Sequence, residues 1–208
     1  MPILPCRKPG RVSGGRLLKL PPASRIFFPG NMNDQPVFAE LFVGWHAEGL
    51  GLTLKVSGKR QPVAGTSKNL SYSDSLLLWL DTRPTGSVHR ATEYCHHFAC
   101  LPVDKHADGA TTVVTQPIAQ QRAQRIESDT RKFLTAVELK KDGYILDVWI
   151  PGSQIYGFGE VAELGRLGFY CVVQDTELGD QTLSVHDDFP ISYDPSTWVQ
   201  LDLQSDAS

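Results

Sequence analysis

The sequence predicts an all-β protein, an antiparallel β-sandwich of the jelly-roll kind with about nine strands and at most one short helix. Residues 50–56, LGLTLKV, alternate strictly between large aliphatic side chains and small or polar ones, as a half-buried antiparallel strand does. Residues 198–203, WVQLDL, follow the same alternation. Amphipathic helices do not alternate with the strand-like segments, which argues against a parallel α/β sheet.

Nine segments have the composition of strands, and short runs of turn residues such as SGK, TRPTG and KKDG separate them. In chain order they are 37–45, 50–56, 75–81, 93–101, 111–116, 133–139, 143–151, 167–175 and 198–203. Only residues 117–132 have a helix-forming composition. Their apolar positions fit a short helix and an irregular surface crossover equally well.

The chain has 208 residues, of which 41% are hydrophobic, enough for one well-buried domain. Residues 1–34 contain six basic residues before the first acidic one, Asp34, and they are rich in proline. We expect them to form a basic, largely irregular arm exposed to solvent. Residues 35–204 are expected to form a single β-sandwich domain, followed by a tail at 205–208.

The formal net charge is −3 and the pI is near 6.0, so the charge of the whole chain gives no reason to expect nucleic acid or an anionic membrane as a partner. There is no apolar run of the length that a signal peptide or a membrane span requires. We therefore expect a cytoplasmic protein. Its four cysteines are then expected to be reduced thiols.

Residues 93–100, EYCHHFAC, place two histidines between two cysteines. In an extended strand the two histidines point to opposite faces, and so do the two cysteines. A structural zinc site normally takes paired ligands from turns, and the sequence has no second pair of that spacing. We therefore expect buried thiols and hydrogen-bonded histidines, while a metal held near the strand ends remains an alternative.

The sequence has no pattern typical of an enzyme active site. It lacks the G-x-S-x-G elbow of serine hydrolases and the G-x-G-x-x-G loop of nucleotide-binding enzymes. Acidic pairs such as Asp187 with Asp188 are expected to lie in loops and to be solvated. We therefore expect a protein that binds a ligand without catalysis.

Five segments between residues 37 and 203 occur in a recognisable order: VGWHAEGLGLTLKVSGK, DSLLLWLDTR, GYILDVWIP, LGFYCVVQD and DPSTWVQLDL. Their succession resembles the pattern of carbohydrate-binding module family 9 and its DOMON-like relatives. The resemblance implies a β-sandwich that binds saccharides without cleaving them, sometimes with structural calcium. For such an ion the first ligands to consider are Asp175, Glu177 and Asp180, because calcium prefers hard oxygen ligands.

A saccharide site combines aromatic surfaces with polar side chains, because a sugar ring presents apolar C–H faces and a rim of hydroxyl groups. Trp149 and Tyr170 each lie on the face of their strand opposite the aliphatic residues, where they could form such a surface or cover a second layer of the core. Planar charged groups suit vicinal hydroxyl groups, although an internal salt-bridged turn would also explain them. The polar candidates are Asp81, Arg83, His89, Arg90 and His96.

The sequence leaves three hypotheses for the function. The first is a non-catalytic protein with a saccharide ligand. The second is a metal-binding or haem-binding DOMON-like protein in which His89, His96 or His97 supplies a ligand. The third is an interaction module whose sandwich face binds a protein partner.

Overall fold

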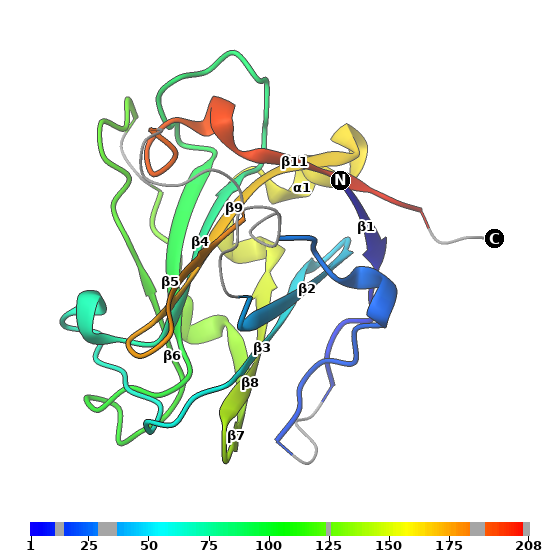
Figure 1. Ribbon diagram of the computed structural model, residues 1–208. Coiled ribbons are helices and arrows are strands. Elements are labelled where there is room, and N and C mark those ends of the chain that lie inside the picture. Colours follow the sequence, from blue (N-terminus) through cyan, green and yellow to red (C-terminus); the bar gives the residue numbers. More distant parts are fainter. Residues whose placement is uncertain (11–14, 29–36, 124–125, 184–189, 206–208) are drawn as a thin grey trace.

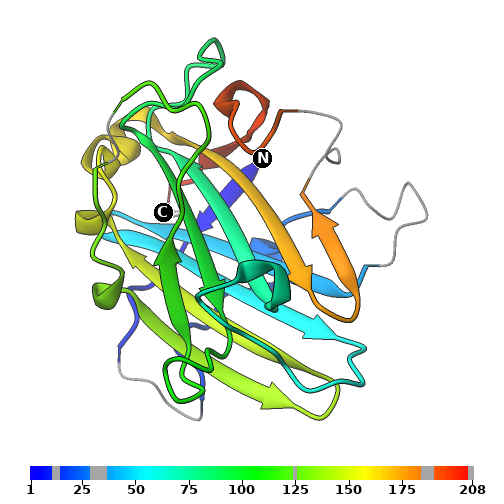
Figure 2. The same cartoon turned by 90° about the vertical axis from the view of Figure 1, so that its left-hand side faces the viewer.

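The nine predicted strands all form, and they build two facing sheets (Figures 1 and 2). The structure is a computed structural model that describes residues 1–10, 15–28, 37–123, 126–183 and 190–205. Sheet A contains β4 (Ser75–Asp81), β5 (Cys95–Leu101), β6 (Thr112–Thr115), β9 (Arg166–Asp175), β10 (Gly179–Thr182) and β11 (Val199–Leu203). Sheet B contains β2 (Ala39–His46), β3 (Gly49–Ser57), β7 (Leu134–Lys140) and β8 (Gly143–Pro151). The all-β prediction is confirmed.

A strand that the sequence did not predict, β1 (Pro2–Pro5), joins the two sheets along one edge. It pairs in parallel with β11 on one side, where Ile3 faces Leu203, and with β2 on the other, where Leu4 faces Gly44. The strand order is therefore β6-β5-β4-β9-β11-β1-β2-β3-β8-β7, with β10 beside β9. All other strand pairs in the described residues are antiparallel, as predicted, and only the two parallel pairs of β1 were not expected.

The main core lies between the sheets and is formed by the predicted aliphatic faces. On β3 the alternating residues of the segment 50–56 are buried, and β8 presents its own alternating set opposite them. The residues in this part of the core are Leu50, Leu52, Leu54, Val56, Tyr144, Leu146, Val148 and Ile150. On β3 and β8 the period-2 pattern predicted which side chains point into the space between the sheets.

The N-terminal segment, defined here as residues 1–10 and 15–28, packs on the sandwich rather than extending into solvent. Ile3, Ile26 and Phe28 are buried in the main core. Leu17 and Leu18 form a second small apolar cluster with Trp149 on the outer face of sheet B. The expected solvated arm is therefore wrong for these buried residues, whose aliphatic and aromatic side chains find apolar partners on the sheets, while others such as Phe27 and Arg25 are exposed.

Two paired glycines allow the N-terminal segment to pack closely against sheet B. Gly44 of β2 faces Gly51 of β3, and both lie under the N-terminal segment. A Cβ atom on Gly44 would lie 2.8 Å from the Cβ of Cys6, and one on Gly51 would lie 3.2 Å from a methyl group of Leu18. The absence of side chains at these positions lets the segment approach the strands closely.

The described residues contain one α-helix, α1 (Phe158–Leu164), which follows β8. Its sequence signals are a glycine at each end, with φ of +80° at Gly157 and +64° at Gly165, and the buried pair Phe158 and Val161. The described part of 117–132 forms only a short 3-10 turn. The 3-10 turns are η1 (Pro22–Ser24), η3 (Leu70–Tyr72), η4 (Thr130–Lys132), η5 (Gly152–Gln154) and η6 (Pro195–Thr197).

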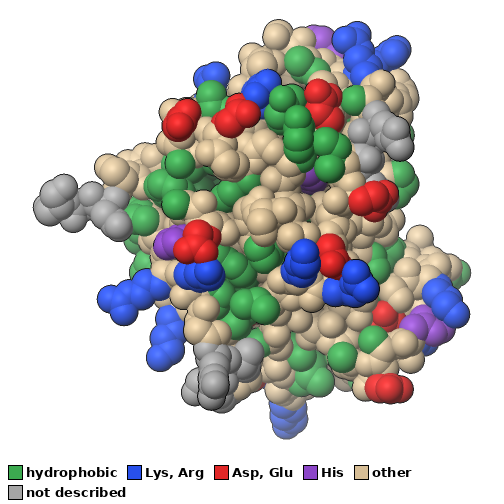
Figure 3. Space-filling view, turned by 180° about the vertical axis from the view of Figure 1, so that it is seen from behind, with side chains coloured by type: hydrophobic (Ala, Val, Ile, Leu, Met, Phe, Trp, Pro, Cys, Tyr) green, Lys and Arg blue, Asp and Glu red, His purple; other side chains and the backbone are tan. Residues whose placement is uncertain are grey.

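No helix in the described ranges is long and apolar enough to span a bilayer. On the face of the molecule shown in Figure 3, acidic and basic side chains are interspersed among apolar and neutral ones. This face therefore has no large field of a single sign of the kind that attracts a polyanion.

Candidate functional site

Four side chains that are partly open to solvent meet at the end of the sandwich where β4 ends and α1 begins. We call them the tyrosine cluster: Arg83, Tyr94, Tyr156 and Glu160. The two phenol rings have centroids 5.1 Å apart and are tilted by 36°. The guanidinium carbon of Arg83 lies 4.0 Å from the ring centroid of Tyr94, and its Nη2 donates to Glu160. The cluster thus combines two aromatic rings with a fixed pair of opposite charges.

Backbone hydrogen bonds hold the cluster together. The hydroxyl group of Thr82 donates to the carbonyl oxygen of Tyr156 at 2.8 Å, and the amide of Thr82 donates to the carbonyl oxygen of Tyr94 at 3.1 Å. The Nε2 atom of His96 lies 3.2 Å from the same Tyr156 oxygen. Three segments distant in sequence are therefore fixed to one another beneath the tyrosines.

Gly157 is required for this close approach. A Cβ atom at this position would lie 2.5 Å from Oγ1 of Thr82 and 2.6 Å from the ring of Tyr94. Its φ of +80° also lies in the left-handed region, where residues with a side chain are strained. Glycine here permits the turn from η5 into α1 and brings Tyr156 beside Tyr94.

Asp81 lies directly beneath the cluster, at the end of β4. Its Oδ1 accepts the backbone amide of Arg83 at 2.9 Å, which turns the chain toward the surface. Burial raises the pKa of the Asp81 carboxyl group, and this hydrogen bond offsets the effect only in part. Asp81 therefore supports the loop backbone. The alternative of a salt-bridged turn would pair Asp81 with Arg83 or Arg90, and Arg83 instead pairs with Glu160.

The side chains of the tyrosine cluster can contact a ligand through an aromatic surface and through hydrogen bonds. Tyr156 is 43% exposed, so part of its surface is accessible to a ligand. Arg83 and Glu160 are each about half exposed and supply hydrogen-bond donors and acceptors at the edge of the aromatic surface. Burial, followed by the hydrogen bond to Tyr156, raises the pKa of Tyr94, so its phenol remains protonated at neutral pH. A neutral aromatic surface beside planar charged groups suits a ring-shaped ligand rich in hydroxyl groups.

The predicted residues His89 and Arg90 lie farther along the same loop. His89 is well exposed, and its Nδ1 lies 3.1 Å from Oδ2 of Asp194 and 3.0 Å from Oγ of Ser196. The serine and the aspartate thus share one ring nitrogen, whereas a catalytic triad places them on different nitrogens of the histidine. Arg90 is exposed beside it. Ligand contacts from these two residues stay a prediction.

The structure corrects the expectation that Trp149 and Tyr170 offer open aromatic faces. Trp149 does point to the outer face of sheet B as predicted, but the N-terminal segment covers it and leaves it 1% exposed. Tyr170 is buried on the outer face of sheet A, 5.4 Å from the ring of Trp79. Both side chains belong to outer apolar layers, which was the alternative that the alternation left open.

Two of the three residues proposed as calcium ligands, Asp175 and Glu177, are already engaged by groups of the protein. Both carboxylate oxygens of Asp175 lie 2.7 Å from Nζ of Lys59, so an ammonium group already occupies the place of a cation. Glu177 instead accepts backbone amides from Arg60 and Gln61. Within the described ranges no group of three or more His, Cys, Asp or Glu side chains is arranged to hold a metal. No step of the function is therefore assigned to calcium.

The histidines of β5 do not converge on a shared ligand site either. Nδ1 of His97 lies 3.1 Å from the carbonyl oxygen of Pro117, and its ring stacks on Trp79 at 4.0 Å. His96 contacts the Tyr156 carbonyl on the other face of the strand. All four cysteines are free thiols, and all but Cys6 are buried. The expectation of buried thiols and hydrogen-bonded histidines is met for β5.

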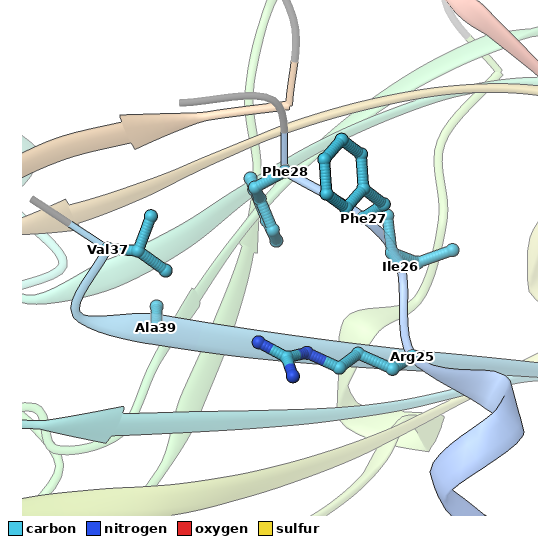
Figure 4. Close-up of a pocket in the computed structure, with 6 residues that line it drawn as sticks. All are labelled: Arg25, Ile26, Phe27, Phe28, Val37 and Ala39. Carbon is cyan, nitrogen blue, oxygen red and sulfur yellow. The ribbon is translucent and has the colours of Figure 1, made fainter. Parts of the chain in front are cut away.

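Several hollows border the sandwich. One, of about 470 Å³, is lined by Lys8, Glu48 and the first turn of α1. A second, of about 290 Å³, is formed by residues on either side of 29–36, which lie outside the described residues (Figure 4). In this second hollow Phe28, Val37 and Ala39 provide an apolar lining beside Arg25.

Sequence reasoning found Asp81, Arg83 and His96 around the tyrosine cluster but missed its two tyrosines and Glu160. Tyr94 stands in the same stretch as the conspicuous histidines and cysteines, which drew attention away from it. Tyr156 stands in IYGFGE, where a glycine directly after an aromatic residue is a turn signal. An aromatic residue at such a turn, outside any strand, could have indicated an exposed ring.

The sequence matches no protein-family model, and no curated protein matches it significantly. Its structure is similar to a family 9 carbohydrate-binding module from Caldicellulosiruptor kristjanssonii in complex with glucose, with a TM-score of 0.58 and 15% identity over 100% of this chain and 99% of the other. The same module in complex with cellotriose gives the same TM-score and identity over 99% of this chain and 96% of the other. A structure from Bacteroides uniformis named as a putative carbohydrate-binding protein gives a TM-score of 0.51 and 11% identity over 80% of this chain and 78% of the other. At these identities the likeness establishes the fold, which is that of family 9 modules.

Proposed function

We propose that this chain is a non-catalytic saccharide-binding protein and that the tyrosine cluster is its binding surface. The observation that carries the proposal is the partly exposed ring of Tyr156 beside Tyr94, with the Arg83–Glu160 pair at its edge. One ring supports the C–H face of a sugar, and the charged pair donates to and accepts from its hydroxyl groups. The structural relatives in complex with glucose and cellotriose support the same class of ligand.

The proposal that the protein is non-catalytic rests on the side chains present in the tyrosine cluster. Its members are two phenols, a guanidinium and one carboxylate, and Glu160 is paired with Arg83. Hydrolysis of a glycosidic bond usually needs two carboxyl groups on either side of the scissile bond, one of them protonated. The cluster has one exposed carboxylate, and the nearby Asp81 is buried beneath the loop.

The test is calorimetric titration with glucose, cellobiose and cellotriose. A small polar ligand on an open surface is expected to bind with micromolar to millimolar affinity, roughly −8 to −4 kcal/mol. Tyr156→Ala should weaken binding at least tenfold, which corresponds to about 1.4 kcal/mol. Arg83→Gln should weaken it by a smaller factor, because the aromatic surface remains.

Tyr72→Ala provides the matched control. Tyr72 is also a well-exposed tyrosine, but it lies in η3, beyond the opposite end of β4. Its replacement should leave the affinity unchanged. Loss of binding in Tyr72→Ala, with Tyr156→Ala unaffected, would place the binding surface at the other end of the sandwich. Absence of binding to every sugar tested would overturn the proposed function.

A further inference from the structure

A lysine is buried between two buried carboxylates inside this sandwich. The side chain of Lys59 is 1% exposed, and its Nζ lies 2.7 Å from each carboxylate oxygen of Asp175 and 3.0 Å from Oδ2 of Asp74. Both aspartate side chains are completely buried. An uncompensated charge at this depth would be very costly, so the three groups depend on one another.

The ammonium group connects the two sheets. Lys59 follows β3 of sheet B, and its backbone amide donates to the carbonyl oxygen of Asp142, in the turn between β7 and β8. Asp74 directly precedes β4 and Asp175 ends β9, and both of these strands belong to sheet A. The ion group therefore joins the sheets at the end of the sandwich opposite the tyrosine cluster.

The oxygens around the ammonium group are held in place by further donors. Oδ1 of Asp74 accepts the backbone amide and the hydroxyl group of Thr176, each at 2.8 Å. Oδ1 of Asp175 accepts the amides of Glu177 and Leu178, each at 2.9 Å. The carboxylates are thus fixed by the backbone independently of Lys59, as ligands of a bound cation usually are.

Tyr144, on β8, carries a buried polar group that feels the charge of these carboxylates. The hydroxyl group of Tyr144 is fully buried and makes no hydrogen bond within the described part of the chain. Burial, together with the negative charges of Asp74 and Asp175, raises the pKa of this phenol well above its ordinary value. The three oxygens that contact the ammonium group therefore all come from Asp74 and Asp175.

We propose that Lys59, Asp74 and Asp175 form a cation site whose cation is built into the chain, with the Lys59 ammonium in the place of a metal ion. The native protein then needs no metal here. Removing the ammonium while keeping both carboxylates should create a site for Ca²⁺, which prefers oxygen ligands. Calcium–oxygen distances of about 2.3–2.6 Å require the carboxylates to move inward by only a few tenths of an ångström.

The test compares thermal melting in EDTA and in millimolar CaCl₂ for the native protein, Lys59→Ala and Lys59→Met. The native melting temperature should be the same in both. Lys59→Ala should melt roughly 10 °C lower in EDTA, because its two carboxylates lose their counter-ion. Calcium should restore several degrees in a saturable manner, because it binds only the folded state. Lys59→Met should be destabilised similarly but not rescued, because its side chain fills the space.

Each result decides the proposal. A native protein that loses stability in EDTA and regains it with calcium would overturn it, and so would a Lys59→Ala variant that is as stable as the native protein or does not respond to calcium. If Lys59→Ala does not fold in EDTA, refolding it with and without calcium gives the same comparison.

Discussion

Replacing Asp147 with asparagine should release residues 16–18 of the N-terminal segment from sheet B. The Asp147 carboxylate is completely buried on the outer face of β8 and accepts five hydrogen bonds. Two come from the guanidinium of Arg16, at 2.8 and 3.1 Å, and two from the backbone amides of Leu17 and Leu18. The fifth comes from the hydroxyl group of Thr53, at 2.6 Å. An asparagine accepts through one oxygen only and turns an NH₂ group toward these donors.

The expected loss of folding stability in Asp147→Asn follows from these contacts. Removing one partner of a buried ion pair costs about 3–5 kcal/mol. The side chain of Arg16 is 28% exposed and can turn toward water, so the lower limit applies. We expect a loss of about 3 kcal/mol and a melting temperature roughly 10 °C lower.

Urea denaturation followed by circular dichroism measures the loss, and limited trypsin digestion locates it. Cleavage after Arg16, which the native fold protects, should become rapid in Asp147→Asn. Glu40→Gln is the matched control, because it removes the carboxylate of an exposed ion pair, Arg25–Glu40, with a 3.0 Å contact. It should change stability by less than about 1 kcal/mol and leave the trypsin pattern unchanged.

The pH dependence of folding stability provides a second test of the role of Asp147. Although burial opposes the charge, the hydrogen bonds from Arg16, Thr53 and the two backbone amides outweigh it and lower the pKa of Asp147. A lowered folded-state pKa adds stability above the unfolded value, about 3.9, and this stability is lost as pH falls through the folded value. The difference between native protein and Asp147→Asn should therefore shrink below about pH 4. A stability change within 0.5 kcal/mol, or additive losses in the Arg16→Met/Asp147→Asn cycle, would refute the reasoning.

Two further predictions concern the loop glycine and the thiols. Gly157→Ala should destabilise the fold by about 1–3 kcal/mol and weaken saccharide binding, because the new methyl group would contact Thr82 at a positive φ. Gly159→Ala, whose Cβ would meet no atom within 4 Å, should not destabilise α1, and equal losses in the two variants would contradict the steric argument. A thiol reagent should detect four free thiols after denaturation. Native protein should react only at Cys6, and slowly, because burial raises the pKa of its thiol to about 11. Rapid reaction of Cys100 in the folded protein would show that β5 is not packed as described.

The strands were predictable because each carries its own signal. Alternation along β3 and β8 identified both the strands and their buried faces, and it placed Trp149 and Asp147 together on the outer face. The strands that were missed lack this signal. β1 has the sequence PILP, with prolines at both ends, and β10 has the polar sequence GDQT. Both form through pairing with strands whose edges are available, which is a property of the assembled sheet.

The cover over Trp149 could not be predicted from local patterns. Arg16 and Asp147 are 131 residues apart, and residues 15–18 have no periodicity that indicates a partner surface. A basic, proline-rich stretch is typical of a solvated arm, and residues 16–18 of this one are fixed to sheet B by a single buried carboxylate and a few apolar contacts. The calcium prediction has the same limit. Lys59, which pairs with Asp175, lies 116 residues away from it in the sequence, so local patterns could not reveal the contact.

The positions of the covered faces determine where a ligand can bind. The N-terminal segment covers Trp149 on sheet B, and Trp79 and Tyr170 are buried on the outer face of sheet A, so neither part offers an aromatic surface to solvent. The two ends of the sandwich remain as places where a ligand could bind, and their side chains differ. One end contains the buried ion group of Lys59, which ties the sheets together, and the other contains the partly exposed tyrosine cluster. Because β4 separates the two ends by about 20 Å, changes at one should add to changes at the other without coupling. The double variant Lys59→Met/Tyr156→Ala should therefore lose stability only through Lys59 and saccharide affinity only through Tyr156.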